Sequence, residues 1–329
     1  MLEDMAEDRI VITIIIPIYN VGPFVKDCLK SVFSQSYKGQ IECILIDDCG
    51  TDDSMVTVQN LIKNYSGSII FKVLHHKTNR GLSAARNTGI DAATGDYLFF
   101  LDSDDELPSN CIKDLVEGTY GKKIDIIAGN FEICGGSRTI IKDYKQNVFY
   151  SNNTDEIIKY YTDEKLYMMA WNKLVRRSFI IENNLYFKEG IIHEDVLWSL
   201  LVINHASSLH IISTSTYFYN MRDGSITNSM SLRKSFDSWI IIIDEFEKSI
   251  LNGNVKNTKD NRNYIEKKKY EWLSTIYGYK KITFKEKMMY FRRIMAYNGS
   301  VNIILKILLA RVKNPIKFYL CNKLCRFYD

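Results

Sequence analysis

The first hundred residues alternate between short apolar runs and segments with helical periodicity. The run at residues 11–16 is almost entirely β-branched, and further apolar runs follow at residues 41–46, 69–74 and 97–101. Strands that alternate with helices over this length indicate βαβ units and a parallel sheet. The sequence therefore predicts an α/β fold, with a mostly parallel sheet flanked by helices.

Three of these runs end in polar residues. Tyr19 and Asn20 follow the first run, Asp47 and Asp48 end the second, and the acidic stretch 102–105 ends the fourth. In an open α/β sheet, ligands bind beyond the carboxyl ends of the strands. Two carboxylates one residue apart suit a hard divalent cation, although a solvated acidic turn explains the fourth run equally well. Three polar ends in succession predict one composite site.

Two common phosphate-binding motifs are missing from the sequence. No Gly-x-Gly-x-x-Gly follows the first strand, and no Gly-x4-Gly-Lys-Ser/Thr occurs anywhere. The dinucleotide-binding and P-loop hypotheses therefore fail. A nucleotide would instead be held by a carboxylate-bound metal and by arginine.

Four motifs follow one another in residues 16–20 (IPIYN), 46–52 (IDDCGTD), 79–90 (NRGLSAARNTGI) and 100–105 (FLDSDD). Together they resemble the family 2 glycosyltransferases, which are inverting enzymes of the GT-A fold, and the resemblance extends over about residues 10–225. Gly50 departs from the pattern, because the family more often has Ser there. The resemblance implies a nucleotide-sugar donor, most simply a UDP-sugar.

The resemblance also implies roles on the donor side. The residues that would pack along the nucleobase are Pro17, Tyr19 and Asn20. Asp48 would accept a hydrogen bond from the uracil N–H, for which a carboxylate is a suitable acceptor. Arg86 is similar to the family's arginine near the base and pyrophosphate, and the alternative is an arginine that only offsets the charge of Asp48 or Asp102.

The same resemblance implies a metal and a phosphate contact. Asp104 would bind Mn²⁺ or Mg²⁺ that bridges the two phosphates, Asp102 would hold the ribose or a metal-bound water, and Ser103 lies between them in the nucleotide-sugar site. Residues 217–227 look like the family's closing segment. Arg222 in that segment is a predicted phosphate ligand, because its planar fork matches phosphate oxygens.

A second acidic pair begins an apolar helical segment near residue 196. Asp195 matches the family's catalytic base, whereas plain helix capping by Asp and Glu is the alternative. Glu194 and His193 are predicted acceptor-side or metal-proximal groups, although a lone His is more often structural. Trp171, in the segment 171–174, is predicted to line the acceptor side or to be a core residue.

The charge of the chain is uneven. From residue 250 onward there are 18 Lys and Arg against 5 Asp and Glu, whereas the preceding part has 25 against 34. The basic amphipathic stretches 281–294 and 301–311 suit an anionic bilayer surface, or alternatively a helical cap on the catalytic domain. No nucleic-acid motif is present and the body is acidic, so no nucleic-acid partner is predicted.

Location follows from what the sequence lacks. No apolar run reaches the roughly 18 to 20 residues that span a bilayer. The acidic N-terminus does not have the layout of a signal peptide, and the seven Cys include no Cys-x-x-Cys pair. These absences predict a cytoplasmic protein, and the basic tail together with the family resemblance suggests work at the inner face of the cell membrane.

These observations combine into one hypothesis. Residues 1–228 form a GT-A catalytic domain, with a nucleotide-sugar half at about 10–105 and an acceptor half at about 106–228, and residues 229–329 form a basic helical extension. The predicted activity is metal-dependent transfer of a sugar to an acceptor hydroxyl, on a glycan or lipid-linked glycan, in surface polysaccharide or glycolipid synthesis. The alternatives are a nucleotidyltransferase, and a non-catalytic sugar-binding or membrane-surface-binding protein on the same scaffold.

Overall fold

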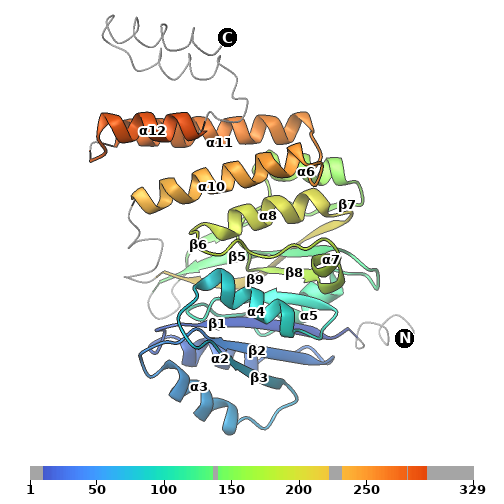
Figure 1. Cartoon of the computed structure of the whole chain (residues 1–329). Helices are drawn as coiled ribbons and strands as arrows, with labels where there is room; N and C mark the ends of the chain where they lie inside the picture. Colours follow the sequence, from blue (N-terminus) through green and yellow to red (C-terminus); the bar gives the residue numbers. More distant parts are fainter. Residues whose placement is uncertain (1–9, 136–139, 222–231, 280, 295–329) are drawn as a thin grey trace, which may run out of the picture. The chain divides into compact units, whose positions relative to one another are not determined.

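The computed structural model describes residues 10–135, 140–221, 232–279 and 281–294. The chain divides into two compact units, Met1–Ser229 and Met230–Asp329. In Figure 1 the first unit is a sheet with helices on its faces, and the second is a group of helices.

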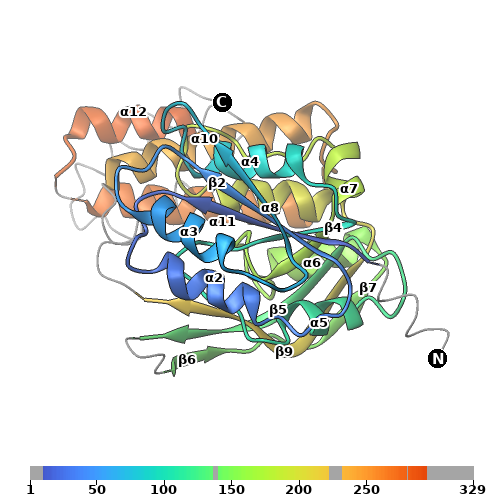
Figure 2. The same ribbon diagram turned by 90° about the horizontal axis from the view of Figure 1, so that it is seen from below.

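Four parallel strands form the part of the sheet that the first hundred residues build. They are β1 (Ile12–Ile18), β2 (Ile41–Asp47), β3 (Ile70–His75) and β4 (Tyr97–Phe100), in the spatial order β3-β2-β1-β4. One face is covered by α4 (Leu82–Ala92) and the other by α2 (Val25–Phe33) and α3 (Ser54–Lys63), which lie on the near side in Figure 2. The predicted parallel sheet of βαβ units is confirmed.

The central strand β1 is stabilised by burial on both of its faces. All of its residues are buried, since helices cover both faces of the parallel sheet. Burial of each large apolar side chain stabilises the fold by roughly 1.5–3 kcal/mol. α4 lies close to β1 because residue 89 is glycine: a Cβ on Gly89 would be 2.3 Å from Ile15 Cγ2.

The remaining strands of the first unit make the sheet mixed. β8 (Lys173–Arg176) lies antiparallel between β4 and β5 (Ile126–Cys134), and β9 (Leu209–Asn220) runs parallel to β5. β6 (Ile140–Tyr144) pairs with β5, so the described residues hold nine strands in one sheet. The helices of this half are α5 (Cys111–Glu117), α6 (Thr154–Thr162), α7 (Arg177–Glu182) and α8 (Glu194–His205).

One local prediction is wrong. The polar and aromatic composition of residues 145–153 predicts a loop, but they contain the short edge strand β7 (Phe149–Ser151), which pairs with β9. Three residues are too few to show the alternation that marks a strand. The strand forms through tertiary contact, because the Phe149 ring stacks on Tyr160 of α6 with 4.0 Å between ring centroids.

The second unit contains α10 (Leu232–Leu251), α11 (Lys259–Gly278) and α12 (Phe284–Ile294). Phe236 and Ile240 of α10 pack with Leu273 of α11 and Tyr290 of α12 in one apolar cluster. The predicted basic stretch 281–294 is largely α12, whereas residues 301–311 lie outside the described residues. None of the helices in the described ranges has the length and apolar character needed to cross a membrane.

Candidate active site

The predicted site residues of the nucleotide half, apart from Arg86 on α4, lie where β1, β2 and β4 end. The loops after β1 and β2 are joined by Asn20, whose Oδ1 accepts from the backbone N–H of Thr51 at 2.7 Å. Gly22 N–H donates to Asp52 Oδ2 at 2.8 Å and strengthens the same junction. Tyr19 remains 47% exposed, so its ring is available to a ligand at this edge.

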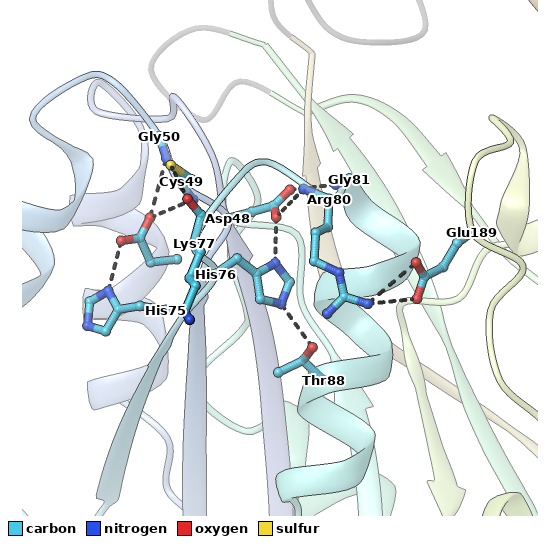
Figure 3. A network of polar contacts seen from close by, with 11 residues as sticks. Asp48, Cys49, Gly50, His75, His76, Lys77, Arg80, Gly81, Thr88 and Glu189 are labelled. Carbon is cyan, nitrogen blue, oxygen red and sulfur yellow. Dashed lines mark hydrogen bonds and ion pairs between the residues drawn. The ribbon is translucent and has the colours of Figure 1, made fainter.

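Asp48 is a candidate nucleobase-binding residue, and it also holds the backbone of residues 80–81 in place. Its Oδ1 accepts from the N–H of Arg80 and its Oδ2 from the N–H of Gly81, both at 2.8 Å (Figure 3). His76 Nδ1 also lies 2.6 Å from Asp48 Oδ1, and His76 Nε2 lies 2.9 Å from Thr88 Oγ1. A carboxylate has about four acceptor positions, so these three donors leave one of them, on Oδ2, for a ligand.

His76 was missed by the sequence analysis, although a signal was present. Two histidines stand together at the end of the third strand, at the same edge as the other polar residues. The first of them, His75, is bound to Asp47 Oδ2 at 2.9 Å, and Asp47 Oδ1 accepts from the N–H of Cys49 at 3.1 Å (Figure 3). The polar end of β3 could therefore have been added to the predicted site.

Arg86 joins the two acidic motifs. Its Nη2 donates to Asp102 Oδ1 at 2.8 Å and its Nη1 donates to Glu194 Oε1 at 2.7 Å. The guanidinium is buried, and it lies over the Phe187 ring at 5.2 Å from the centroid. Burial lowers the pKa of Arg86, but Asp102 and Glu194 outweigh burial and raise it overall, so the side chain stays charged.

The alternative predicted for Arg86 was that it offsets the charge of Asp48 or Asp102. Within the described residues Arg86 forms an ion pair with Asp102 and none with Asp48, so this alternative is met in part. Its Nε is buried without a hydrogen-bond partner. A role of Arg86 at the base or pyrophosphate remains a prediction.

Asp195 stands beside this pair in the first turn of α8, and its side chain is partly exposed. Burial, followed by the nearby Glu194 carboxylate, raises the pKa of Asp195 to about 7, and Arg86 opposes the rise. His193 is the N-cap residue in a left-handed conformation, with φ of 62°, and its side chain makes no capping bond. Burial lowers the pKa of His193, so its neutral form is favoured.

The acidic loop after β4 alternates between partly exposed and buried residues. Asp102 and Asp104 are partly exposed, whereas Ser103 and Asp105 are buried. Burial, together with Asp104 and Asp102, raises the pKa of Asp105 well above its usual range. The two carboxylates that the sequence predicts as metal ligands are therefore the two that solvent reaches.

β9 holds this loop in place. The hydroxyl of Tyr217 accepts from Asp102 N–H at 3.2 Å and donates to Asp105 Oδ2 at 2.8 Å. Asn220 N–H donates to Asp105 Oδ1 at 2.8 Å. Trp171 stacks on Tyr217 with 4.3 Å between centroids and is only 7% exposed, which fits the core alternative predicted for it. Arg222 lies outside the described residues.

Comparison with known proteins settles the family. Residues 13–183 match the sequence model described as glycosyl transferase family 2. The chain belongs to this family. The match includes Asp48, Arg86 and Asp102, and Asp195 lies beyond its end. The resemblance that the four motifs indicated is confirmed.

Two sets of relatives agree with the family. The Staphylococcus aureus poly(ribitol-phosphate) β-N-acetylglucosaminyltransferase TarP is 29% identical over 303 residues, which are 90% of this chain and 89% of TarP. The chain spans 63% and 62% of the length of two other curated relatives, which are named only as uncharacterized glycosyltransferases. This family 2 chain is therefore a glycosyltransferase, as predicted.

Solved structures identify the fold as GT-A. S. aureus TarS 1–349 in complex with UDP-GlcNAc has a TM-score of 0.64 at 19% identity, covering 91% of this chain and 81% of that one. The mannosyltransferase PcManGT of Pyrobaculum calidifontis, in complex with GDP-Man and Mn²⁺, has a TM-score of 0.55 at 13% identity and coverages of 98% and 81%. The predicted fold class is confirmed.

The carboxylates of the acidic loop after β4 suit a divalent cation that a bound ligand would also coordinate. Within the described residues no cluster of three or more His, Cys, Asp or Glu is assembled for a metal. Asp102 and Asp104 offer two carboxylates, and Mg²⁺-type ions commonly take one or two carboxylates and complete their shell with waters and substrate phosphates. The residues therefore suit a metal that arrives with a nucleotide diphosphate.

Proposed function

We propose that this glycosyltransferase moves a sugar from a UDP-sugar to an acceptor hydroxyl, with inversion at the anomeric carbon. The observation that carries the proposal is the bridge made by Arg86 between Asp102 and Glu194, which sets Asp195 beside the acidic loop. A carboxylate with a pKa near the working pH is suited to general-base catalysis. Asp195, with its pKa of about 7, meets that requirement.

The nucleotide half of the proposed catalytic domain 1–228 is residues 10–105. Pro17, Tyr19 and Asn20 would contact the nucleobase. The remaining acceptor position of Asp48 would accept a hydrogen bond from an N–H of that nucleobase. Uracil has such an imide donor. The TarS structure was solved with UDP-GlcNAc, so UDP-GlcNAc is the first donor to test.

Asp102 and Asp104 would hold Mn²⁺ or Mg²⁺, while Asp102 and Ser103 would also border the nucleotide sugar. When bound, such a cation neutralises the charge that builds on the departing diphosphate. PcManGT, which shares the fold, was solved with Mn²⁺ and GDP-Man. Arg222 would add a phosphate contact.

The proposed reaction is a single displacement. An Asp195 carboxylate oxygen takes the proton of the acceptor hydroxyl as that oxygen bonds to the anomeric carbon. The bond from this carbon to the diphosphate oxygen breaks at the same time, and the electron pair leaves with UDP. His193, Glu194 and Trp171 belong to the proposed acceptor half, residues 106–228, where the buried Trp171 would act through its neighbours.

The proposed acceptor is a glycan or lipid-linked glycan in surface polysaccharide or glycolipid synthesis. TarP and TarS are named for transfer to poly(ribitol phosphate), so a phosphate polymer belongs in the acceptor panel. The basic extension 229–329 would hold the enzyme at the anionic inner face of the membrane. In its described part, the residues of α12 that would supply positive charge are Lys285, Lys287, Arg292 and Arg293.

The test is UDP release from UDP-, GDP- and dTDP-sugars, with Mn²⁺ or with chelator and without acceptor. We expect slow metal-dependent release from one UDP-sugar, with UDP-GlcNAc as the first candidate. A chain that neither turns over nor binds any donor, as judged by calorimetry, would contradict the proposal and favour a binding protein. Release of pyrophosphate instead of UDP would indicate a nucleotidyltransferase.

A further inference from the structure

Residues 185–187 lie between α7 and α8 and form a short segment, here named the bridging segment, that the proposed mechanism does not use. Leu185 and Phe187 of this segment are each only 2% exposed. The segment belongs to no helix or strand of the described chain. Buried backbone groups outside regular structure need other hydrogen-bond partners, so the partners of the bridging segment show what holds it in place.

Asn87 of α4 binds the backbone of the bridging segment on one side. Its Oδ1 accepts from the N–H of Phe187 at 2.8 Å, and its Nδ2 donates to the carbonyl of Phe187 at 2.9 Å. The two residues are 100 positions apart in the chain. An asparagine amide offers both a donor and an acceptor, whereas an ionised aspartate only accepts and an alanine side chain does neither. The side chain of Asn87 therefore satisfies both backbone groups of one buried residue.

α8 binds the bridging segment on the other side. The indole Nε1 of Trp198 donates to the carbonyl of Leu185 at 3.0 Å. The ring of Phe187 stacks on Trp198, with 4.7 Å between centroids and 11° between the ring planes. Trp198 is three residues after Asp195 on α8, which makes the two neighbours on the helix surface. The bridging segment thus connects α4 to the turn of α8 that carries Asp195.

The ring of Phe187 also supports the residue that holds the other side of Asp195. The Arg86 guanidinium lies over this ring, 5.2 Å from the centroid, and its Nη1 donates to Glu194 Oε1 at 2.7 Å. Glu194 precedes Asp195, and Trp198 follows it. A shift of Phe187 would therefore disturb contacts on both sides of Asp195.

We propose that Asn87 is a positioning residue for Asp195, which it holds in place through the backbone of Phe187. This inference rests on the proposed function, because it assigns a support to the proposed base. Asn87 exchanges no proton and contacts no substrate in this role. It fixes Phe187, whose ring packs on Trp198 and beneath Arg86, and so it sets the position of the first turns of α8. Loss of Asn87 should therefore lower kcat more than it weakens donor binding.

The deciding measurement is hydrogen exchange of the Trp198 indole N–H, followed by NMR on the full-length chain without substrate. The chain has four Trp, and Trp198→Phe assigns the signal. In Asn87→Ala we expect this proton to exchange roughly tenfold faster, because the bridging segment loses two hydrogen bonds. The backbone N–H of Ile14, in the buried strand β1, should change less. A Trp198 indole that is unchanged, or that is accelerated no more than Ile14, would overturn the inference, since a general loss of stability affects both alike.

Asn183→Ala is the matched control. Asn183 stands just before the bridging segment, and its Nδ2 also donates to a backbone carbonyl, that of Phe179 in α7, at 2.8 Å. This variant should leave the exchange of the Trp198 indole and kcat at their wild-type values. If Asn87→Ala does not fold, Asn87→Asp keeps the shape of the side chain and the acceptor for the Phe187 N–H but loses the donor. It should accelerate the Trp198 exchange in the same direction, and wild-type exchange in Asn87→Asp would count against the inference.

The exchange measurement needs no substrate, so UDP release from UDP-GlcNAc with Mn²⁺ by the wild type tests the proposed function separately. Where turnover occurs, kcat of Asn87→Ala should fall by about 10- to 100-fold, because a displacement of about 1 Å at a catalytic group can cost that much. The affinity for UDP with Mn²⁺, measured by calorimetry, should change by less than kcat does. A wild-type kcat in Asn87→Ala, or a loss of UDP affinity as large as the loss of kcat, would refute the positioning role.

Discussion

Arg86 Nη1 donates to Glu194 Oε1 at 2.7 Å, although the two residues are 108 positions apart in the chain. The contact joins α4, in the nucleotide half of the sheet, to the first turn of α8. Glu194 is buried, so the pair is shielded from solvent. The side chain that the family resemblance connects with the donor is therefore also a structural link to the proposed base.

Arg86→Met should destabilise the protein strongly. The change leaves Glu194 buried and Asp102 partly buried without their cation, and removing one partner of a buried ion pair costs about 3–5 kcal/mol. Urea unfolding followed by circular dichroism would measure the loss in the free energy of unfolding. The matched control is Arg80→Met, because Arg80 and Glu189 form an exposed pair, with side chains 47% and 46% accessible. Its loss should be about 0–1 kcal/mol. Equal losses for both variants would contradict the bridging role of Arg86.

Asp195→Asn should abolish most transfer and preserve donor binding. General-base assistance typically contributes about 10²- to 10⁴-fold, so kcat should fall by at least that factor. Steady-state UDP release and calorimetry with UDP would separate turnover from binding. As a control, Asp163→Asn changes an exposed pair with Lys159 on α6 and should keep wild-type kcat. Near-normal turnover by Asp195→Asn would rule out Asp195 as the base.

The activity should rise with pH through about 7. The base must be deprotonated to accept the hydroxyl proton, and the pKa of Asp195 in the free enzyme is about 7. A profile of kcat/KM against pH reports the ionisations of the free enzyme. A profile that is flat from pH 5.5 to 8, roughly one pKa unit either side of the expected midpoint, would be inconsistent with Asp195 as the base.

The stability of the protein should fall as pH rises between 3.8, the usual pKa of an Asp side chain, and about 7, the pKa of Asp195 in the folded protein. There the folded protein holds a proton on Asp195 that the unfolded chain has lost, so the free energy of unfolding falls as pH rises. Asp195→Asn removes this contribution. Its stability relative to wild type should therefore be higher at pH 8 than at pH 5, which urea unfolding at the two pH values would measure.

Much of this architecture follows from the sequence because local and tertiary preferences agree. The β-branched run at the N-terminus is the central strand β1, and the apolar face of α10 is buried at Phe236 and Ile240. The polar ends of β1 and β2 do meet, through the bond from Thr51 N–H to Asn20 Oδ1, since parallel strands place their carboxyl ends at one edge. The periodicity of the sequence does not predict β7, which is too short, or the antiparallel position of β8 between β4 and β5.

Partners of buried polar groups were also beyond the sequence. The motifs named Asp48, Arg86 and Glu194, but not the contact of His76 with Asp48, nor the sharing of Arg86 between Asp102 and Glu194. Such pairs join residues that are distant in the chain, so only the fold determines them. For the same reason, the core alternative for Trp171 could be weighed against the acceptor-lining role only when its stacking on Tyr217 was seen.

Asp104→Asn should weaken the metal-dependent part of donor binding. The side chain is partly exposed beside Asp102, and losing one of two carboxylates removes half of the protein charge offered to a cation. UDP titrated by calorimetry with Mn²⁺ should bind at least about tenfold more weakly to the variant, equivalent to about 1.4 kcal/mol. With chelator, the variant and wild type should bind UDP alike. Asp53→Asn, at the exposed N-cap of α3, is the control. Equal Mn²⁺-dependent affinity in Asp104→Asn and wild type would exclude Asp104 as a metal ligand.

His76→Phe should weaken donor binding more than it slows turnover. The imidazole lies 2.6 Å from Asp48 Oδ1 and is nearly inaccessible, so its loss leaves Asp48 with its two backbone donors (Figure 3). Removing one partner of a buried polar group costs about 1–3 kcal/mol. If this cost weakens nucleobase binding at Asp48, the KM for the UDP-sugar should rise roughly tenfold. His75→Phe is the matched control, because His75 is its neighbour in the chain but its side chain is 54% exposed and pairs with Asp47. If both variants raise KM equally, the Asp48–His76 pair has no special part in donor binding, and the polar end of β3 acts only through general stability.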